Sequence, residues 1–382
     1  MLDAMMVLTT MVGSWAGSSY MTVASLPMPP SEKPSLLLTC GDPAGIGPEV
    51  IAKAWAATPE HAHARLRVVA DAGMLIGMLA TRSGLPRLSV VVVQAADPRD
   101  SSPDSLLVID LPDARADTVE AGVISAAGGA AAAAAVETAA RLVHDGLASG
   151  IVTGPLHKAA LHAAGFDVPG HTEMLARACG LADDAVSMML WLPWERPAGL
   201  SAGLGVVHVT LHESLSHALA RLSTNGIVEA GLRLASLLKP LLGRRPRIAV
   251  AALNPHAGEA GLFGDEEQRL IAPAVRQLAE AGLNATGPLP ADTLFLRASR
   301  GEFDGVVAQY HDQGHIPVKL LGMHRAVNIT LGLPFVRTSV AHGTAFDIVG
   351  TGAADPASML AAIDAAVRLV KAGWPSRPQA GF

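Results

Sequence analysis

The chain has 382 residues, 50% of them hydrophobic and 16% charged, and a net charge of −6 with histidine neutral. This length predicts two or three domains, and the composition excludes a disordered chain, which combines low hydrophobicity with high charge. The acidic balance and the 4% of aromatic residues argue against nucleic-acid binding, which needs clustered cations or stacking rings.

The N-terminal segment Met1–Pro34 differs from the rest of the chain. It is rich in methionine, then in proline and serine, and its first cation is Lys33, so it lacks the basic start of a secretory signal. We expect Met1–Pro34 to be either a disordered extension or a segment that is not translated, because the true start codon lies further downstream. Polar residues dilute the apolar stretch Ala4–Ser31, so no membrane span is expected. Two cysteines cannot form a disulfide framework, which favours a cytoplasmic location.

From Ser35 onward, short apolar runs alternate with helix-like segments. This alternation predicts an α/β fold with a largely parallel or mixed sheet. The predicted strands are Ser35–Thr39, Leu66–Ala70, Ser89–Val93, Leu106–Ile109, Gly150–Thr153, Gly205–Thr210, Arg247–Ala252 and Gly305–Gln309. The predicted helices begin near Pro48 or cover Ala121–Asp145, Glu213–Leu222 and Glu266–Ala281.

Three histidines follow apolar strand runs. His212 comes after the run at Val206–Leu211, His256 after Ile248–Pro255, and His311 after Val306–Tyr310. Ligand crevices form outside the carboxyl ends of strands, and three imidazoles with an open position make a catalytic metal site. No short metal-binding motif links the three, so ordinary polar residues at strand ends remain an equal alternative.

Two segments have the features of anion sites at the start of a helix. The loop Gly41–Glu49 follows the first strand, although a tight turn explains its glycines as well, and it contains neither GxGxxG nor a phosphate-binding GK[ST]. His171 and Thr172 follow Pro169-Gly170 and open a helix, where Thr172 would bind phosphate or simply cap the helix.

Further along, Lys319, Asn328 and Arg337 form a polar series embedded among apolar residues. Lysine is almost never fully buried without a partner, so Lys319 is interpreted as a catalytic or substrate-binding cation rather than a surface residue. The alternative is a surface lysine whose stem covers apolar neighbours.

Seven motifs in order resemble the 4-hydroxythreonine-4-phosphate dehydrogenase family of vitamin B6 biosynthesis. The resemblance extends from about Ser35 to about Leu369. The motifs are GDPAGIGPE (41–49), TGPLHK (153–158), GHTE (170–173), LNPHAGE (253–259), GPLPADTLF (287–295), YHDQG (310–314) and NITLGLPFVRTS (328–339).

This resemblance implies two α/β domains like those of isocitrate and isopropylmalate dehydrogenases, with the active site in the cleft between them and no classical Rossmann fold. It implies residues 35–165 plus 340–382 in one domain, and 166–339, with the metal ligands and dimer interface, in the other. The implied metal ligands are His212, His256 and His311, one of them from the partner of an obligate homodimer. The implied substrate contacts are His171, Thr172, Lys319, Asn328 and Arg337.

The implied reaction is the NAD-dependent oxidation of 4-hydroxythreonine 4-phosphate to a 3-oxo acid, which then decarboxylates. The metal is left open among zinc, cobalt, magnesium, manganese and nickel. Ala341, where the biosynthetic enzymes usually carry aspartate, and the stretches 261–267 and 311–322 resemble a sister branch acting on D-threonate or D-erythronate 4-phosphate. A hydrolase or aldolase using the same three histidines, and a non-catalytic binding protein, are the alternatives from other classes.

Overall fold

A computed structural model describes residues 33–168, 170–182, 185–194 and 203–375, which belong to one compact unit. The predicted extension at 1–34 lies, apart from its last two residues, outside this described part. No helix among the described residues combines the length and the apolar character needed to cross a membrane.

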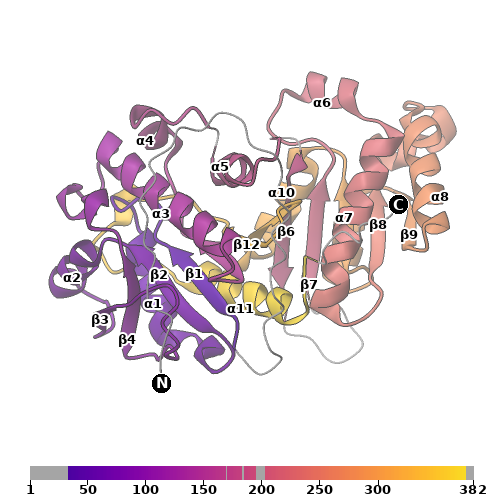
Figure 1. The fold of residues 1–382 in the computed structure, drawn as a ribbon. Helices are drawn as coiled ribbons and strands as arrows, with labels where there is room; N and C mark the ends of the chain where they lie inside the picture. The colour runs from indigo at the N-terminus through magenta and orange to yellow at the C-terminus, as the bar shows by residue number, and fades with distance from the viewer. Residues whose placement is uncertain (1–32, 169, 183–184, 195–202, 376–382) are drawn as a thin grey trace, which may run out of the picture. The chain divides into compact units, whose positions relative to one another are not determined.

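A twelve-stranded mixed sheet runs through the molecule (Figure 1) in the order β3-β4-β2-β1-β5-β12-β11-β6-β7-β10-β8-β9. Six strands belong to one side of it: β1 (Ser35–Thr39), β2 (Arg65–Ala70), β3 (Ser89–Val92), β4 (Ser105–Asp110), β5 (Gly150–Thr153) and β12 (Val336–Val340). The other six are β6 (Ser187–Pro193), β7 (Gly203–His208), β8 (Arg247–Ala251), β9 (Asn284–Leu289), β10 (Gly305–Ala308) and β11 (Val327–Leu331).

The sheet consists of two parallel blocks that run in opposite directions. Strands from β3 to β12 in the sheet order are parallel to one another, and so are β7, β10, β8 and β9. Between these blocks, β11 and β6 pair antiparallel with each other and with their outer neighbours. The two-domain division stays a prediction, because the sheet continues through both parts.

Helices cover both faces of the sheet, which gives three layers (Figure 1). The core on one face contains residues of α1 (Gly47–Ala57), α2 (Ala72–Thr81), α7 (Thr224–Leu242), α8 (Ala272–Glu280) and α11 (Ala357–Lys371). The other face has two separate cores. One core contains residues of α3 (Ala126–His144), α4 (Lys158–Ala163) and α5 (His171–Ala178), and the other contains residues of α9 (Ala291–Ser299) and α10 (His311–Gly322).

The predicted α/β class is confirmed, and most predicted strands agree with the structure within one residue. The strand predicted at 205–210 is wrong in its bounds, since β7 begins at Gly203 and ends at His208. Helix α3 begins at Ala126 rather than at 121, because the Ser125 hydroxyl caps it by accepting a hydrogen bond from the Gly128 amide. The helix predicted at 213–222 is shorter: α6 spans Leu215–Arg221.

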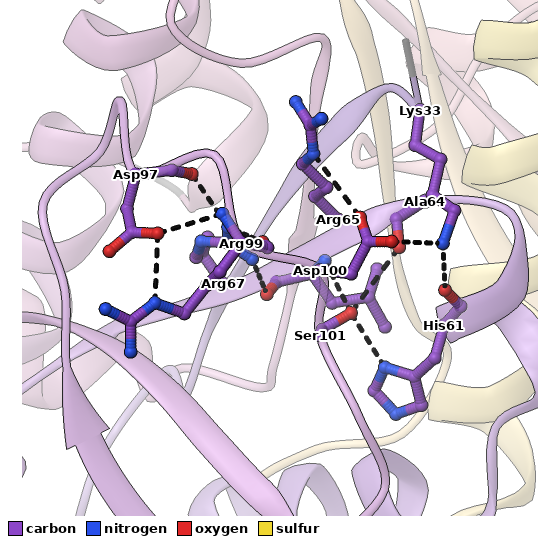
Figure 2. Close-up of polar contacts among 10 residues, drawn as sticks. Lys33, His61, Ala64, Arg65, Arg67, Asp97, Arg99, Asp100 and Ser101 are labelled. Atoms are coloured by element: carbon purple, nitrogen blue, oxygen red, sulfur yellow. Dashed lines mark hydrogen bonds and ion pairs between the residues drawn. The ribbon is translucent and has the colours of Figure 1, made fainter.

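A buried arginine fixes the amino end of β2 to the loop before β4 (Figure 2). Arg67, only 1% exposed, donates hydrogen bonds to the carbonyl oxygens of Asp97 and Arg99, at 3.0 and 2.5 Å. Nearby, Lys33 pairs with Asp100 at 2.8 Å. These groups join β2 to the loop before β4 and lie outside the pocket described next, so we assign them a structural role.

Candidate active site

The candidate site occupies the sheet face between the α3–α5 core and the α9–α10 core. Apolar side chains at alternate positions of β11 and β12 belong to the core on the opposite face, so Asn328, Thr330, Arg337 and Ser339 point the other way. A pocket of about 200 Å³ lies there. Its lining includes five of the predicted residues, namely His171, Thr172, His212, Asn328 and Arg337.

Arg337 is a buried cation at this pocket, 3% exposed. Its guanidinium donates to the hydroxyl oxygens of Thr330 at 2.9 Å and Thr153 at 2.7 Å, while its Nε has no hydrogen-bond partner among the described residues. Burial lowers the pKa of Arg337 to about 10, and the nearby Glu173 carboxylate opposes that shift. None of the ion pairs within the described residues involves Arg337, so this pocket is prepared to accept an anion.

The first turn of α5 forms another wall of the pocket. Its residues His171, Thr172 and Glu173 all line the cavity, next to the unpaired amides of a helix start. Nε2 of His171 is buried and has no hydrogen-bond partner in the part of the chain that the structure describes. Burial, and then the charge of Arg337, lower the pKa of His171 well below its usual value, so the ring is neutral at pH 7. A neutral imidazole here still offers a hydrogen bond to a ligand.

The loop at 41–49 packs against Gly154 and Pro155, which line the pocket. The Asp42 amide donates to the Pro155 carbonyl at 2.9 Å, and Gly154, which lines the pocket, donates to Thr39 at 2.7 Å. A Cβ at Gly41, where φ is +71°, would lie 2.0 Å from the Pro155 oxygen, so only glycine fits there. The tight-turn interpretation of these glycines therefore suffices.

Four histidines form a continuous series beside the pocket. His212 lines it, and its ring centre lies 5.8 Å from that of His311. His311 stacks on His315 at 3.7 Å, and His315 Nδ1 shares a hydrogen bond of 3.1 Å with His208 Nε2. Burial is the largest cause that lowers the pKa values of His208, His212 and His315, the last to about 4. Neutral imidazoles are the form that binds metal ions.

His256, the third predicted ligand, does not join this series within one chain. Its side chain is 63% exposed, and its Nδ1 donates to Glu259 at 2.8 Å. No group of three or more histidine, cysteine, aspartate or glutamate side chains placed to hold a metal ion occurs among the described residues. One chain therefore brings His212 and His311 together. A site with three histidine ligands would need its third histidine from a second chain.

The loop that carries His256 has an unusual backbone. Five successive residues, from His256 to Ala260, have φ between +40° and +77°. This left-handed turn, Pro255–Gly261, contains four non-glycine residues in a conformation that costs roughly 1–2 kcal/mol each. Backbone strain of this kind clusters at functional sites, where the surrounding structure maintains it.

Lys319 is exposed on α10 and is not among the residues that line the pocket. Its charge is one of the causes that lower the pKa of His315, after burial and His311, which places it near the histidine series. Lys319 is therefore not buried within the single chain, and its apolar neighbours include the 82% exposed Leu320, while its role as a substrate-binding cation stays a prediction.

Several pocket residues were not predicted from the sequence. Lys158, Glu173, Ser339 and His342 line the cavity, and Nε2 of His342 is buried without a partner. Lys158, Glu173 and Ser339 lie within the motifs quoted above, which was the available signal. His208 and His315 were also missed. The alternation of Val206 and His208 across Val207 places both on one face of β7, and this pattern is visible in the sequence.

Comparison with known proteins identifies relatives of this chain. A family model described as "Pyridoxal phosphate biosynthetic protein PdxA" matches residues 62–366. The chain is 45% identical over 338 residues to a 4-hydroxythreonine-4-phosphate dehydrogenase of Beijerinckia indica, covering 87% of this chain and 94% of that one. It is 42% identical over 339 residues to a D-threonate 4-phosphate dehydrogenase of Salmonella typhimurium, covering 88% and 99%.

A solved structure supports the same conclusion. The crystal structure of a 4-hydroxythreonine-4-phosphate dehydrogenase from Klebsiella pneumoniae has a TM-score of 0.76 and 41% identity, covering 90% of this chain and 99% of that one. Fold, pocket and relatives together define an oxidoreductase of the dehydrogenase class. The chain belongs to the PdxA family, which confirms the resemblance found in its motifs.

Proposed function

We propose that this protein oxidises 4-hydroxythreonine 4-phosphate with NAD and a divalent metal ion. The product is a 3-oxo acid, which decarboxylates to 3-amino-2-oxopropyl phosphate. The observation that carries the proposal is Arg337, a buried guanidinium that forms no ion pair within the described part of the chain, in one pocket with His171, whose Nε2 finds no hydrogen-bond partner in that part either. Relatives named for phosphorylated substrates support a phosphorylated hydroxy acid as the ligand.

The anionic groups of the substrate are assigned to the cationic wall of the pocket. Arg337, His171 and Thr172 would bind one anion, since guanidinium groups and helix-start amides both favour phosphate or carboxylate. Asn328 already donates from Nδ2 to the Val340 carbonyl at 3.2 Å, so its position at the pocket is fixed. Lys319, from α10, is proposed as the cation that completes anion binding and acts on the reacting end of the substrate.

The proposed metal ligands are His212, His311 and His256, the last from the second copy of a homodimer. His212 and His311 fit this role because they lie together beside the pocket, and burial lowers the pKa of His212 and so favours its neutral form. When bound, a zinc, cobalt, magnesium, manganese or nickel ion supplies a Lewis acid for the substrate oxygen. The exposed Leu215 and Leu219 of α6 support a second copy packing nearby.

The reaction balances with these components. A hydride leaves the substrate carbon that bears the hydroxyl and reduces NAD, the hydroxyl proton is released, and the resulting 3-oxo acid loses its carboxyl group as carbon dioxide. The buried cation at Arg337 and the neutral imidazole of His171 hold the substrate in the pocket. A low-dielectric pocket strengthens each of these charge interactions.

The experiment that tests the proposal follows NADH absorbance with 4-hydroxythreonine 4-phosphate, with and without a chelator, while light scattering reports the oligomeric state. We expect NADH production that stops with the chelator and returns with added divalent metal, from a dimer. Absence of NADH with every phosphorylated acid would refute the proposal. Affinity for metal without affinity for NAD would instead favour a metal-dependent hydrolase or aldolase.

A second candidate substrate is D-threonate or D-erythronate 4-phosphate. Relatives named D-threonate 4-phosphate dehydrogenase are 42% and 44% identical to this chain, close to the 45% of the biosynthetic relative. Ala341 also bears on this choice, because the biosynthetic enzymes usually carry aspartate at this position. Its backbone amide donates a hydrogen bond to the Ser358 hydroxyl, and its methyl side chain offers no polar group to a substrate. The ratio of kcat/KM for the three acids, measured side by side, decides between the two.

A further inference from the structure

The left-handed turn Pro255–Gly261 is held in place by one buried carboxylate. Glu267 is 3% exposed, and its Oε1 accepts hydrogen bonds from the backbone amides of Leu253 and Asn254, at 2.8 and 2.7 Å. Its Oε2 accepts from the side-chain amide of Asn254 at 3.0 Å. These donors lie directly before the turn, so the carboxylate determines how the chain enters it.

The same carboxylate also contacts the middle of the turn. A Cβ at Gly258, where φ is +77°, would lie 2.7 Å from Glu267 Oε2. The turn is therefore packed onto the carboxylate at its centre as well as hydrogen-bonded to it at its start. None of the ion pairs within the described part of the chain involves Glu267, so hydrogen bonds alone compensate its burial.

The helix that presents Glu267 is itself irregular. Residues Glu267–Ile271 form a π-helical turn before α8, and Glu267 is its first residue. Such turns are rare and are found mostly at functional sites. The π-helical turn and the left-handed turn thus meet at the Glu267 side chain. The predicted metal ligand His256 lies in the left-handed turn.

We propose that Glu267 is a positioning residue that fixes the left-handed turn and thereby the direction in which His256 is presented. The inference rests on the proposed role of His256 as a metal ligand. Glu267 acts through the turn and touches neither substrate nor metal. Residues that orient metal ligands in this way are needed for full affinity, and their loss typically weakens metal binding by 10–100-fold.

The test uses Glu267→Gln in the full chain, with cobalt(II) as the probe in calorimetric titration. An amide cannot accept at both ends, so one set of hydrogen bonds to the turn is lost. We expect the Kd for cobalt to rise about 10–100-fold, while kcat at saturating cobalt recovers to within about threefold of wild type. In the metal-free protein, amide hydrogen exchange across 255–261 should become faster.

The matched control is Asp265→Asn. Asp265 lies two residues away, but its carboxylate faces Arg269 at 3.4 Å, so the cobalt Kd should stay within about twofold. If Glu267→Gln does not fold, Asn254→Ala removes the side-chain bonds alone and should raise the Kd in the same direction. Folded variants at both positions with wild-type affinity would overturn the proposal.

A double-variant cycle separates positioning from general destabilisation. In a His256→Ala background, Glu267→Gln should cause no further loss of cobalt affinity, because the ligand that it positions is gone. Fully additive losses would show that Glu267 does not act through His256. If the wild-type chain binds no cobalt, the metal assignment fails, and the exchange rates alone then decide whether Glu267 holds the turn.

Discussion

Replacing Arg337 with methionine should separate substrate binding from folding. Burial lowers the pKa of Arg337 from 12.5 to about 10, and at about 1.4 kcal/mol per pH unit this destabilises the buried cation by roughly 3 kcal/mol. Its two hydrogen bonds to threonine hydroxyls, worth about 1.5–3 kcal/mol each for a charged donor, offset that penalty. The free energy of unfolding of the ligand-free variant should therefore change by no more than about 2 kcal/mol.

The effect on catalysis should be much larger. Two charge-assisted hydrogen bonds to a substrate anion contribute about 3–4 kcal/mol, so kcat/KM should fall by roughly 10²–10³-fold. The assays are NADH production and urea unfolding with and without inorganic phosphate, which should stabilise the wild type alone. The reasoning is refuted if Arg337→Met keeps kcat/KM within threefold and loses several kcal/mol of stability.

Arg67→Met provides the matched control. Arg67 is equally buried, but its guanidinium donates to the backbone carbonyl oxygens of Leu66, Asp97 and Arg99, and none of these residues lines the pocket. Removing it leaves buried acceptors without donors, which costs about 1–3 kcal/mol for each. This variant should thus lose stability while the folded fraction keeps its kcat/KM, the opposite of Arg337→Met.

Three further predictions concern the histidines and the strained turn. First, His212→Ala or His311→Ala should weaken cobalt binding by more than about 100-fold in calorimetry, since each removes a proposed ligand; unchanged binding would exclude the metal assignment. Second, the lowered pKa of His315, about 4 against 6.5 in the unfolded chain, means that the unfolded state binds protons first. In the metal-free protein, the contribution of His315 to the free energy of unfolding should be fully present above pH 6.5 and decline by about 1.4 kcal/mol per pH unit as pH falls toward 4. In urea unfolding, His315→Leu should remove this contribution to the pH dependence of the unfolding free energy. Third, Ala260→Gly should be neutral or stabilise by up to about 1 kcal/mol, because φ is +58° there, whereas Ala279→Gly in α8 should cost about 1 kcal/mol; equal losses would contradict left-handed strain at Ala260.

The sequence was informative where short-range chemistry decides the structure. Apolar runs predicted β1, β5 and β8 almost residue by residue, because buried parallel strands consist of little else. The pocket residues His171, Asn328 and Arg337 were predicted from motifs, and the structure brings them together although Arg337 lies 166 residues after His171. Antiparallel pairing of β11 with β12 brings Asn328 near Arg337, and α5 shares a core with Leu333 and Phe335, which precede β12; a local sequence pattern contains neither contact.

Other features depend on contacts that the sequence does not reveal. Alanine and glutamate have no preference for left-handed backbone, so nothing at Ala257, Glu259 or Ala260 announces the turn. The pairing of His208 with His315 depends on how α10 packs against β7, which is a tertiary contact. Lys319 shows the converse case, in which apolar neighbours suggested burial but the helix turns them toward solvent.

The hydrogen bonds of Arg337 also mean that this side chain is ordered before a ligand binds. The guanidinium lies on β12 near the middle of a twelve-stranded sheet and is held by hydroxyls from β5 and β11, so its rotamer is already selected before any ligand arrives. The three proposed metal ligands, in contrast, lie on loops (His212 and His256) and at a helix start (His311). An anion arriving at Arg337 therefore loses little of its affinity to ordering the protein, and the entropy cost of assembly falls on the metal-binding side of the pocket.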